Sequence, residues 1–177
     1  MTGLESSRLI LRPLEHRDAT QRYVDWLNDP AVNRYLETRH QVQTLGACRS
    51  FIEQSNKDPN THLFGIFLKE TGEHIGNAKL GFINPLYKKA QLSLFIGEQS
   101  CWNHGFAGEV VRTLTDFGFN GLGMERIEAG CYEENLASLR VFLKVGYTVE
   151  GFMRSHVVSN GVRSGCFWLG ILKNEWR

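Results

Sequence analysis

The stretch "IGEQSCWNHGFAGEVV", residues 96–111, places small residues where an apolar run gives way to helical spacing. Gly105, Ala107 and Gly108 would leave the first main-chain N–H groups of that helix uncovered. These groups have no partner within a helix, and the helix dipole adds partial positive charge there. The pattern indicates either a binding site for a phosphate or a tight strand-to-helix turn without a ligand.

Other phosphate loops and metal sites do not fit the sequence. It contains no G-x-x-x-x-G-K-[ST], which excludes a Walker loop. Gly118, Gly121 and Gly123 follow a helical segment instead of a strand, so helix termination is the better interpretation. The cysteines form no C-x-x-C pair and have no zinc-ligand spacing, so no metal is expected; they are Cys48, Cys101, Cys131 and Cys166.

The composition is typical of an ordinary globular protein, with 42% hydrophobic and 22% charged residues in 177. This length predicts a single domain over residues 1–177. A formal net charge of +1 favours neither a nucleic-acid nor a membrane partner. Glu5, Arg8 and Arg12 interrupt any apolar leader, and no run approaches the ~20 residues of a membrane helix. We expect a cytoplasmic protein.

The periodicity of apolar residues predicts the element order β, α, α, β, β, β, α, β, α, β, β. The helices expected to matter here cover about His16–Asn28, Gly105–Asn120 and a short segment ending at Gly146. A terminal hairpin has its tip at Asn160-Gly161. The fold class is therefore α/β (α+β), with one mixed, mostly antiparallel sheet of about seven strands and helices on both faces.

The glycine turn and a later segment, "NLASLRVFLKVGYTVEG", together resemble the GNAT superfamily of acyl-CoA N-acyltransferases. The resemblance extends over nearly the whole chain, through "ESSRLILRPLEHRDA" and "WLNDPAVNRYLETRH". It is nearest to the branch of ribosomal-protein N-terminal and amino-sugar-nucleotide N-acetyltransferases. It implies a GNAT-like fold and acetyl-CoA as the co-substrate.

The resemblance also implies which residues hold coenzyme A. The strand Leu92–Ile96 would splay from its neighbour, and the pantetheine arm would pair with its exposed edge. Main-chain N–H groups near Phe95 and Ile96 would face the thioester oxygen, where losing one such donor typically costs ~3–4 kcal/mol. Asn135 would bind the cofactor arm from the opposite side. The pyrophosphate would lie on the main chain of Trp102, Asn103, His104, Gly105, Phe106, Ala107 and Gly108.

Two positions depart from the family pattern of acid and base. Many members carry a tyrosine that protonates the leaving sulfur, and the matching residue here is Phe142. Ser138, one turn earlier, is expected to donate this proton instead, and also to contact the cofactor. Many members also carry a glutamate base at the position of Gln91. His40 is the first choice as replacement base, and the alternatives are His74, His104 and Glu73.

The expected acceptor is a primary amine of low pKa, because deprotonating a lysine-like amine at pH 7 costs roughly 4–5 kcal/mol without a carboxylate base. An amino-sugar nucleotide is the first choice, and polyamines are disfavoured. Arg34, Arg39, Lys88 and Lys89 are candidates to meet acceptor phosphates. An N-terminal protein acetyltransferase and a non-catalytic CoA-binding module are the alternatives. A homodimer is left open.

Overall fold

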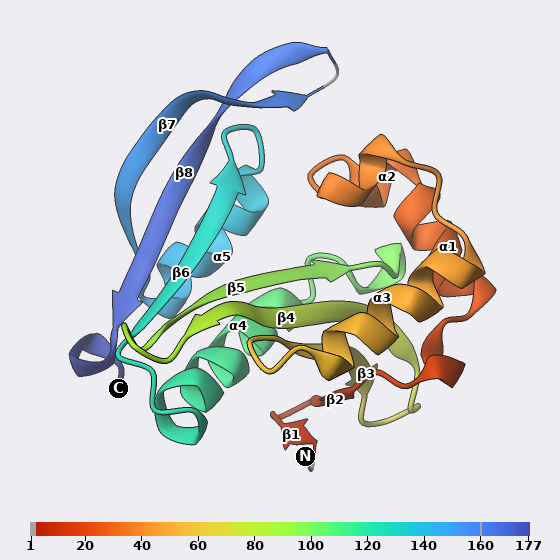
Figure 1. Ribbon diagram of the computed structural model, residues 1–177, viewed down its shortest axis with the longest axis horizontal. Helices are drawn as coiled ribbons and strands as arrows, with labels where there is room; N and C mark the ends of the chain where they lie inside the picture. Colours follow the sequence, from red (N-terminus) through yellow and green to blue (C-terminus); the bar gives the residue numbers. More distant parts are fainter. Residues whose placement is uncertain (1–2, 160) are drawn as a thin grey trace.

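The computed structural model describes residues 3–159 and 161–177, and its strands form one sheet in the order β1-β2-β3-β4-β5-β6-β8-β7 (Figure 1). Every neighbouring pair is antiparallel except β5 and β6, which confirms the mixed, mostly antiparallel sheet. The strands are β1 (Leu4–Glu5), β2 (Leu9–Pro13), β3 (His62–Leu68), β4 (His74–Asn84), β5 (Lys89–Ile96), β6 (Arg126–Tyr132), β7 (Thr148–Ser159) and β8 (Val162–Leu172).

The sheet has eight strands instead of about seven, because a two-residue strand at the N-terminus pairs with β2. At the other end, the predicted hairpin is present, with Ser159 of β7 opposite Val162 of β8. Gly161 at its tip has φ 78°, the left-handed conformation that glycine tolerates. Asn160, the other residue of the predicted tip, lies outside the described residues.

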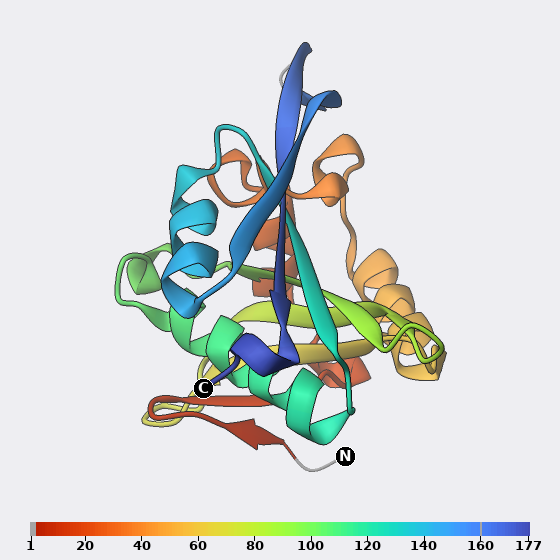
Figure 2. The same cartoon turned by 90° about the vertical axis from the view of Figure 1, so that its left-hand side faces the viewer.

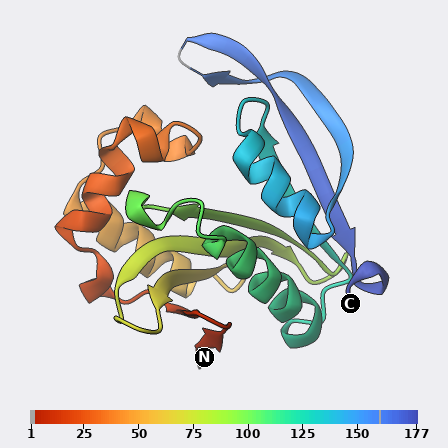
Figure 3. The ribbon, with the colours of Figure 1, turned by 180° about the vertical axis from the view of Figure 1, so that it is seen from behind.

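Helices cover both faces of the sheet, as predicted (Figures 2 and 3). One face carries α1 (Gln21–Asn28) and α3 (Leu45–Lys57), with α2 (Pro30–Asn33) and a 3-10 turn, η2 (Glu37–His40), leading from one to the other. The opposite face carries α4 (Phe106–Asp116) and α5 (Leu136–Val145). Two apolar clusters fill the two layers between helices and sheet.

The first helix begins later than the periodicity indicates. Residues 16–18 form a 3-10 turn, and α1 starts at Gln21 after Thr20, whose hydroxyl accepts the Tyr23 N–H. The cause is Asp18, which is nearly buried and accepts two hydrogen bonds at 2.8 Å from Arg12. This ion pair holds the entry to the helix in a non-helical path.

The fourth helix matches its predicted face but not its predicted end. Val110 and Leu114 are completely buried against the sheet. The α-helix ends at Asp116 and continues as a π-helical turn, Phe117–Gly121. A side chain at Gly118 would come within 2.5 Å of Ile127 on β6, so a glycine is needed for this close approach.

The parallel pair β5–β6 is short and then opens. The register is Lys89↔Arg126, Ala90↔Ile127 and Gln91↔Glu128, after which the two strands diverge (Figure 1). Residues 92–96 of β5 therefore have a neighbour on the β4 side only. We call the opening between residues 92–96 of β5 and residues 129–132 of β6 the fork.

Candidate functional site

The turn before α4 presents a run of main-chain N–H groups. The six N–H groups from Asn103 to Gly108 have no hydrogen-bond acceptor among the described residues. Gly105, at the N-cap, has φ 81° and ψ 2° and provides no side-chain cap. A side chain at Gly108 would meet no atom within 4 Å, so the space beside the first helical turn is open. An anion placed there would satisfy donors that the chain leaves unpaired.

Arg8 fixes this turn from the start of β2, a contact that the sequence analysis did not predict. Its guanidinium donates to the main-chain oxygen of His104 at 3.0 Å and lies 4.3 Å above the ring of Phe106. It also pairs at 2.9 Å with Glu109, which accepts a hydrogen bond from the Ser6 hydroxyl. The Arg8 side chain is 48% exposed, so its positive charge reaches solvent beside the unpaired N–H groups.

The edge of β5 that faces the fork is defined by its pairing with β4. The N–H of Gly97 donates to the oxygen of Ile75 at 2.8 Å, and Phe95 lies opposite Asn77. Because main-chain groups alternate in direction along a strand, the N–H of Phe95 points to β4 and that of Ile96 points into the fork. Of the two predicted donors, Ile96 is therefore the one aimed at the opening.

The indole of Trp102 closes the end of this edge. Its Nε1–H donates to the main-chain oxygen of Ile96 at 2.8 Å. The oxygen of Ile96 is thus occupied, while its N–H stays available on the fork side. The first residue of the glycine turn is in this way tied to the last residue of β5.

The start of α5 brings two further predicted residues to the same side of the sheet, where α4 and α5 pack together (Figure 3). Asn135 caps the helix by accepting the N–H of Ser138 at 3.2 Å. The Ser138 hydroxyl lies 3.4 Å from the sulfur of Cys131 and remains partly exposed. Phe142, one turn later, is 2% exposed and packs edge-on against Tyr147. Of these two residues only Ser138 combines a polar hydrogen with access to solvent.

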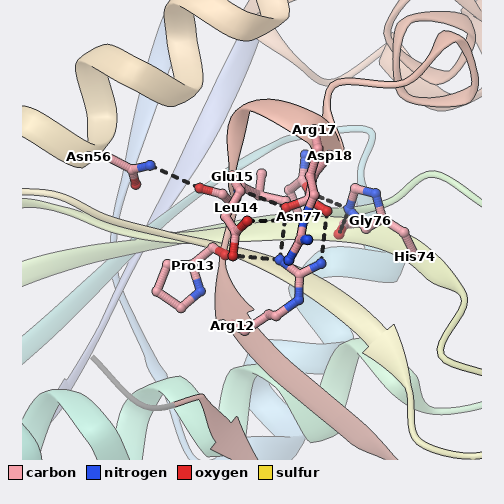
Figure 4. A network of polar contacts seen from close by, with 10 residues as sticks. All are labelled: Arg12, Pro13, Leu14, Glu15, Arg17, Asp18, Asn56, His74, Gly76 and Asn77. Atoms are coloured by element: carbon pink, nitrogen blue, oxygen red, sulfur yellow. Dashed lines mark hydrogen bonds and ion pairs between the residues drawn. The ribbon is translucent and has the colours of Figure 1, made fainter.

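The candidate bases are widely separated. His74 lies in a buried polar network, where its Nε2 is 2.8 Å from Asn77 Oδ1 and 3.0 Å from the oxygen of Gly76 (Figure 4). Burial lowers the pKa of His74, so it is neutral near pH 7. Glu73 forms an ion pair with Arg22. His104 belongs to the glycine turn before α4, whereas His40 lies in the 3-10 turn between α2 and α3.

His40 lies in the 3-10 turn that connects the N-terminal helices with strands β6 and β7. Its Nε2 is 3.8 Å from Glu37, which accepts a hydrogen bond from the Tyr132 hydroxyl at the end of β6. Arg39 donates to the same hydroxyl and to the oxygen of Val158 on β7, each at 2.9 Å. The 3-10 turn thereby spans the open end of the fork. Glu37 was not among the functional residues expected from the sequence.

Arg39 is only 11% exposed and is committed to these contacts. Two of the other basic residues considered for an acceptor also have side-chain contacts, and Lys88 is exposed. Arg34 lies 4.9 Å over the ring of Tyr35, and Lys89 lies 3.5 Å from Glu128 at the closed end of the fork. Lys88 adopts a left-handed conformation in the β4–β5 connection at that same end.

A pocket of about 190 Å³ opens beside the fork. It contains Gln91, the residue at the position of the expected base, and Ser93 two residues further along β5. A larger hollow of about 590 Å³ continues beside α3 and shares Lys79 and Phe82 with the pocket. The remaining residues that line the pocket are Leu92, Gly130 and Trp168.

The described residues contain neither a cluster of metal ligands nor a membrane-spanning helix. Within residues 3–159 and 161–177, no three His, Cys, Asp or Glu side chains cluster as they would to hold a metal ion. Across the same part of the chain, no helix has the length and apolar character needed to cross a membrane.

Comparison with known proteins gives consistent matches. A family model described as an acetyltransferase (GNAT) domain matches residues 8–148. The uncharacterised N-acetyltransferase p20 of Bacillus licheniformis is 30% identical over 179 residues, which cover 99% of both chains. Spermidine N(1)-acetyltransferase of Escherichia coli (strain K12) is 26% identical over 167 residues, covering 94% of this chain and 87% of that one. The fold is shared with spermidine N-acetyltransferase from Vibrio cholerae in complex with CoA and spermine, at a TM-score of 0.86, 20% identity and coverage of 96% and 98%.

Proposed function

Because the chain belongs to the GNAT acetyltransferase family, we propose that it transfers the acetyl group of acetyl-CoA to a primary amine of a small molecule. The observation that carries the proposal is the run of unpaired N–H groups from Asn103 to Gly108. They lie at the N-terminus of α4, where the helix dipole favours negative charge. This supports binding of a pyrophosphate at the turn that Trp102 begins.

The fork supports the position of the rest of the cofactor. The edge of β5 at Ile96 offers a main-chain donor toward the opening, as a thioester oxygen requires. Asn135 at the start of α5 supplies a side-chain amide from the other side. The N–H of Phe95 points to β4 and is not available to the thioester oxygen. We therefore assign Phe95 a role only as part of the strand that the cofactor would follow.

When bound, acetyl-CoA supplies a thioester whose carbon–sulfur bond breaks as the amine nitrogen bonds to the acetyl carbon. The amine then loses one proton and the sulfur gains one. We propose that the Ser138 hydroxyl donates the proton that the sulfur gains. Ser138 would thus take the role of the family's tyrosine, whose position in this chain is occupied by Phe142. We propose that His40, at the rim of the fork, accepts the proton that the amine loses, through a water molecule.

The acceptor we favour is an amino-sugar nucleotide, whose amine is largely neutral near pH 7 and needs no strong base. Two of the similar proteins are named as spermidine acetyltransferases. The amines of spermidine are more basic than that of an amino sugar, so our proposal gives this chain a different acceptor from theirs. An N-terminal protein acetyltransferase is the second candidate, because the hollow of about 590 Å³ beside α3 adjoins the pocket and offers further surface to a larger acceptor. We propose that residues 1–177 act as one domain in the cytoplasm.

Two measurements test the proposal. Calorimetry with coenzyme A should give a single binding site. Release of free thiol from acetyl-CoA should then be followed with a UDP-amino sugar, a peptide with a free N-terminal serine, and spermidine. Activity on the UDP-amino sugar supports the favoured acceptor, and activity on the peptide alone supports the second candidate. Binding of CoA without thiol release on any amine would identify a non-catalytic module.

A further inference from the structure

Lys79 is the one charged side chain in the pocket beside the fork, among the residues that the structure describes. It lies on β4 directly opposite Ser93 of β5. Its side chain lines both the pocket and the adjoining hollow beside α3. The ammonium group is 5.6 Å from the centre of the Phe82 ring.

No carboxylate of the described chain lies within 4.0 Å of this ammonium group. Glu128, beside Gln91, is held instead by Arg126 at 2.8 Å and by Lys89 at 3.5 Å. Asp58 lines the hollow, but its oxygens accept hydrogen bonds from the Asn60 N–H and the Thr61 hydroxyl.

Asp58 attracts this ammonium group from beyond ion-pair distance, but that attraction only partly offsets the hydration lost by burial. In agreement with this, burial lowers the pKa of Lys79 from its ordinary value. The remaining cost is offset if a ligand brings a negative charge into direct contact with the ammonium group. The same charge would repel a polycation that entered the pocket.

We propose that Lys79 recognises an anionic group on the acceptor, so that the substrate is a primary amine carrying a phosphate or a carboxylate and not a polyamine. This rests on the proposed function, because it assigns the pocket to the acceptor. Gln91 and Ser93 provide neutral hydrogen-bonding groups beside the cation. The acceptor thereby meets Lys79 at one end and the fork at the other.

The register sets the size of such an acceptor. The fork-facing N–H of Ile96 is three residues beyond Ser93, the residue opposite Lys79. At about 3.3 Å per residue, the two points are separated by roughly 10 Å along the strand. The Lys79 side chain runs over Gly81 toward Phe82, away from Ile96. It must therefore turn back along β4 to hold an anionic group within this distance of the amine.

The test uses four amines with one measurement of thiol release. Glucosamine 6-phosphate and muramic acid carry a phosphate and a carboxylate on the same amino sugar, glucosamine carries neither, and spermidine is a polycation. For the wild type, we expect kcat/KM to be higher for one anionic sugar than for glucosamine by about tenfold or more, the factor that one charge-assisted hydrogen bond supplies. The anionic sugar with the higher kcat/KM shows whether Lys79 recognises a phosphate or a carboxylate.

Three variants assign the preference to Lys79. Lys79→Met should abolish the preference for the anionic sugar and leave glucosamine nearly unchanged, whereas Lys79→Arg should keep most of it. Lys69→Met is the matched control, because Lys69 is also partly covered but pairs with Glu5 near the first strands. It removes the same charge far from the pocket and should leave the preference intact. A melting temperature for each variant identifies any loss of folding.

Two results would overturn the inference: a wild-type preference for spermidine, or equal losses on glucosamine and the anionic sugars in Lys79→Met. If no amine is acetylated, the proposed function fails, and calorimetry with the two anionic sugars in the presence of CoA decides the inference separately. Binding that Lys79→Met weakens by about tenfold, one charge-assisted hydrogen bond, supports it. Absence of binding to the wild type contradicts it.

Discussion

The indole nitrogen of Trp102 donates a hydrogen bond of 2.8 Å to the main-chain oxygen of Ile96. This bond links the glycine turn to the last residue of β5 and removes a free carbonyl from the edge of the fork. The two parts of the proposed cofactor site, one for the pyrophosphate and one for the thioester, are therefore held at a fixed spacing by a single side chain.

Replacing Trp102 with phenylalanine removes this hydrogen bond and keeps an aromatic ring. A typical hydrogen bond contributes about 1 kcal/mol, so the Kd for CoA should rise about fivefold. The matched control is Trp176→Phe, which removes an indole hydrogen bond of 3.1 Å to Asp116 near the C-terminus. Calorimetry should show no change in CoA affinity for this control. Equal effects of both variants would contradict a role for Trp102 in the site.

Gly105→Ala separates backbone strain from ligand binding. Gly105 has φ 81°, and Gly123, in the turn before β6, has φ 69° with open space around it. An alanine at either position should lower the free energy of unfolding by about 1–2 kcal/mol, because L-residues disfavour this conformation. Only Gly105→Ala should also weaken CoA binding, since only Gly105 belongs to the run of unpaired N–H groups. Urea denaturation and calorimetry measure the two effects.

Ser138→Ala should lower kcat with a much smaller effect on the Kd for CoA. A positioned proton donor typically contributes a factor of about 10² or more, and the buried ring of Phe142 has no proton to donate. Ser50→Ala on the exposed surface of α3 is the control for a serine-to-alanine change in a helix. An unchanged kcat for Ser138→Ala would assign the proton to water.

The partly buried His74 makes the free energy of unfolding depend on pH. Burial lowers its pKa below 6.5 in the folded state, whereas the unfolded chain binds a proton at about 6.5. Below that pH the unfolded state therefore holds more protons, and stability falls as the pH falls. The slope from one proton is at most ~1.4 kcal/mol per pH unit.

Urea denaturation between pH 7 and pH 5 measures this slope, and His74→Gln should flatten it.

The ion pair of Asp18 with Arg12 acts in a more acidic range. Burial opposes ionisation of Asp18, but hydrogen bonds from Arg12 and the Glu15 N–H outweigh it and keep the pKa below 3.8. Its contribution is lost only as the pH falls below that value. A steep slope retained in His74→Gln would exclude His74 as the cause.

The parts of the site built from neighbouring residues were predictable from the sequence. The small residues of the glycine turn and the apolar face of α4 depend on local chemistry, and the structure has both. The same is true of Gly146, which ends α5 in a left-handed conformation. The divergence of β5 and β6 followed from the family resemblance and not from periodicity.

The parts that depend on distant residues were not predictable. Arg8 reaches the glycine turn across almost 100 positions, and nothing near it in the sequence indicates that contact. Lys79 alternates with apolar residues like any strand lysine, so its place in the pocket depends on the register between β4 and β5. The late start of α1 likewise depends on the ion pair of Asp18 with Arg12, which neither segment reveals alone.

Among the described residues, three register pairs make up the β5–β6 ladder that joins the two halves of the sheet at the closed end of the fork. Beyond them, the wing made of β6, β8 and β7 is connected to the rest through packed helices and the contacts of Arg39. A molecule that lies along β5 replaces a missing strand and braces the two halves against each other. Its free energy of binding then adds to the stability of the fold, so we expect the protein to unfold at a higher temperature with the proposed cofactor bound than without it.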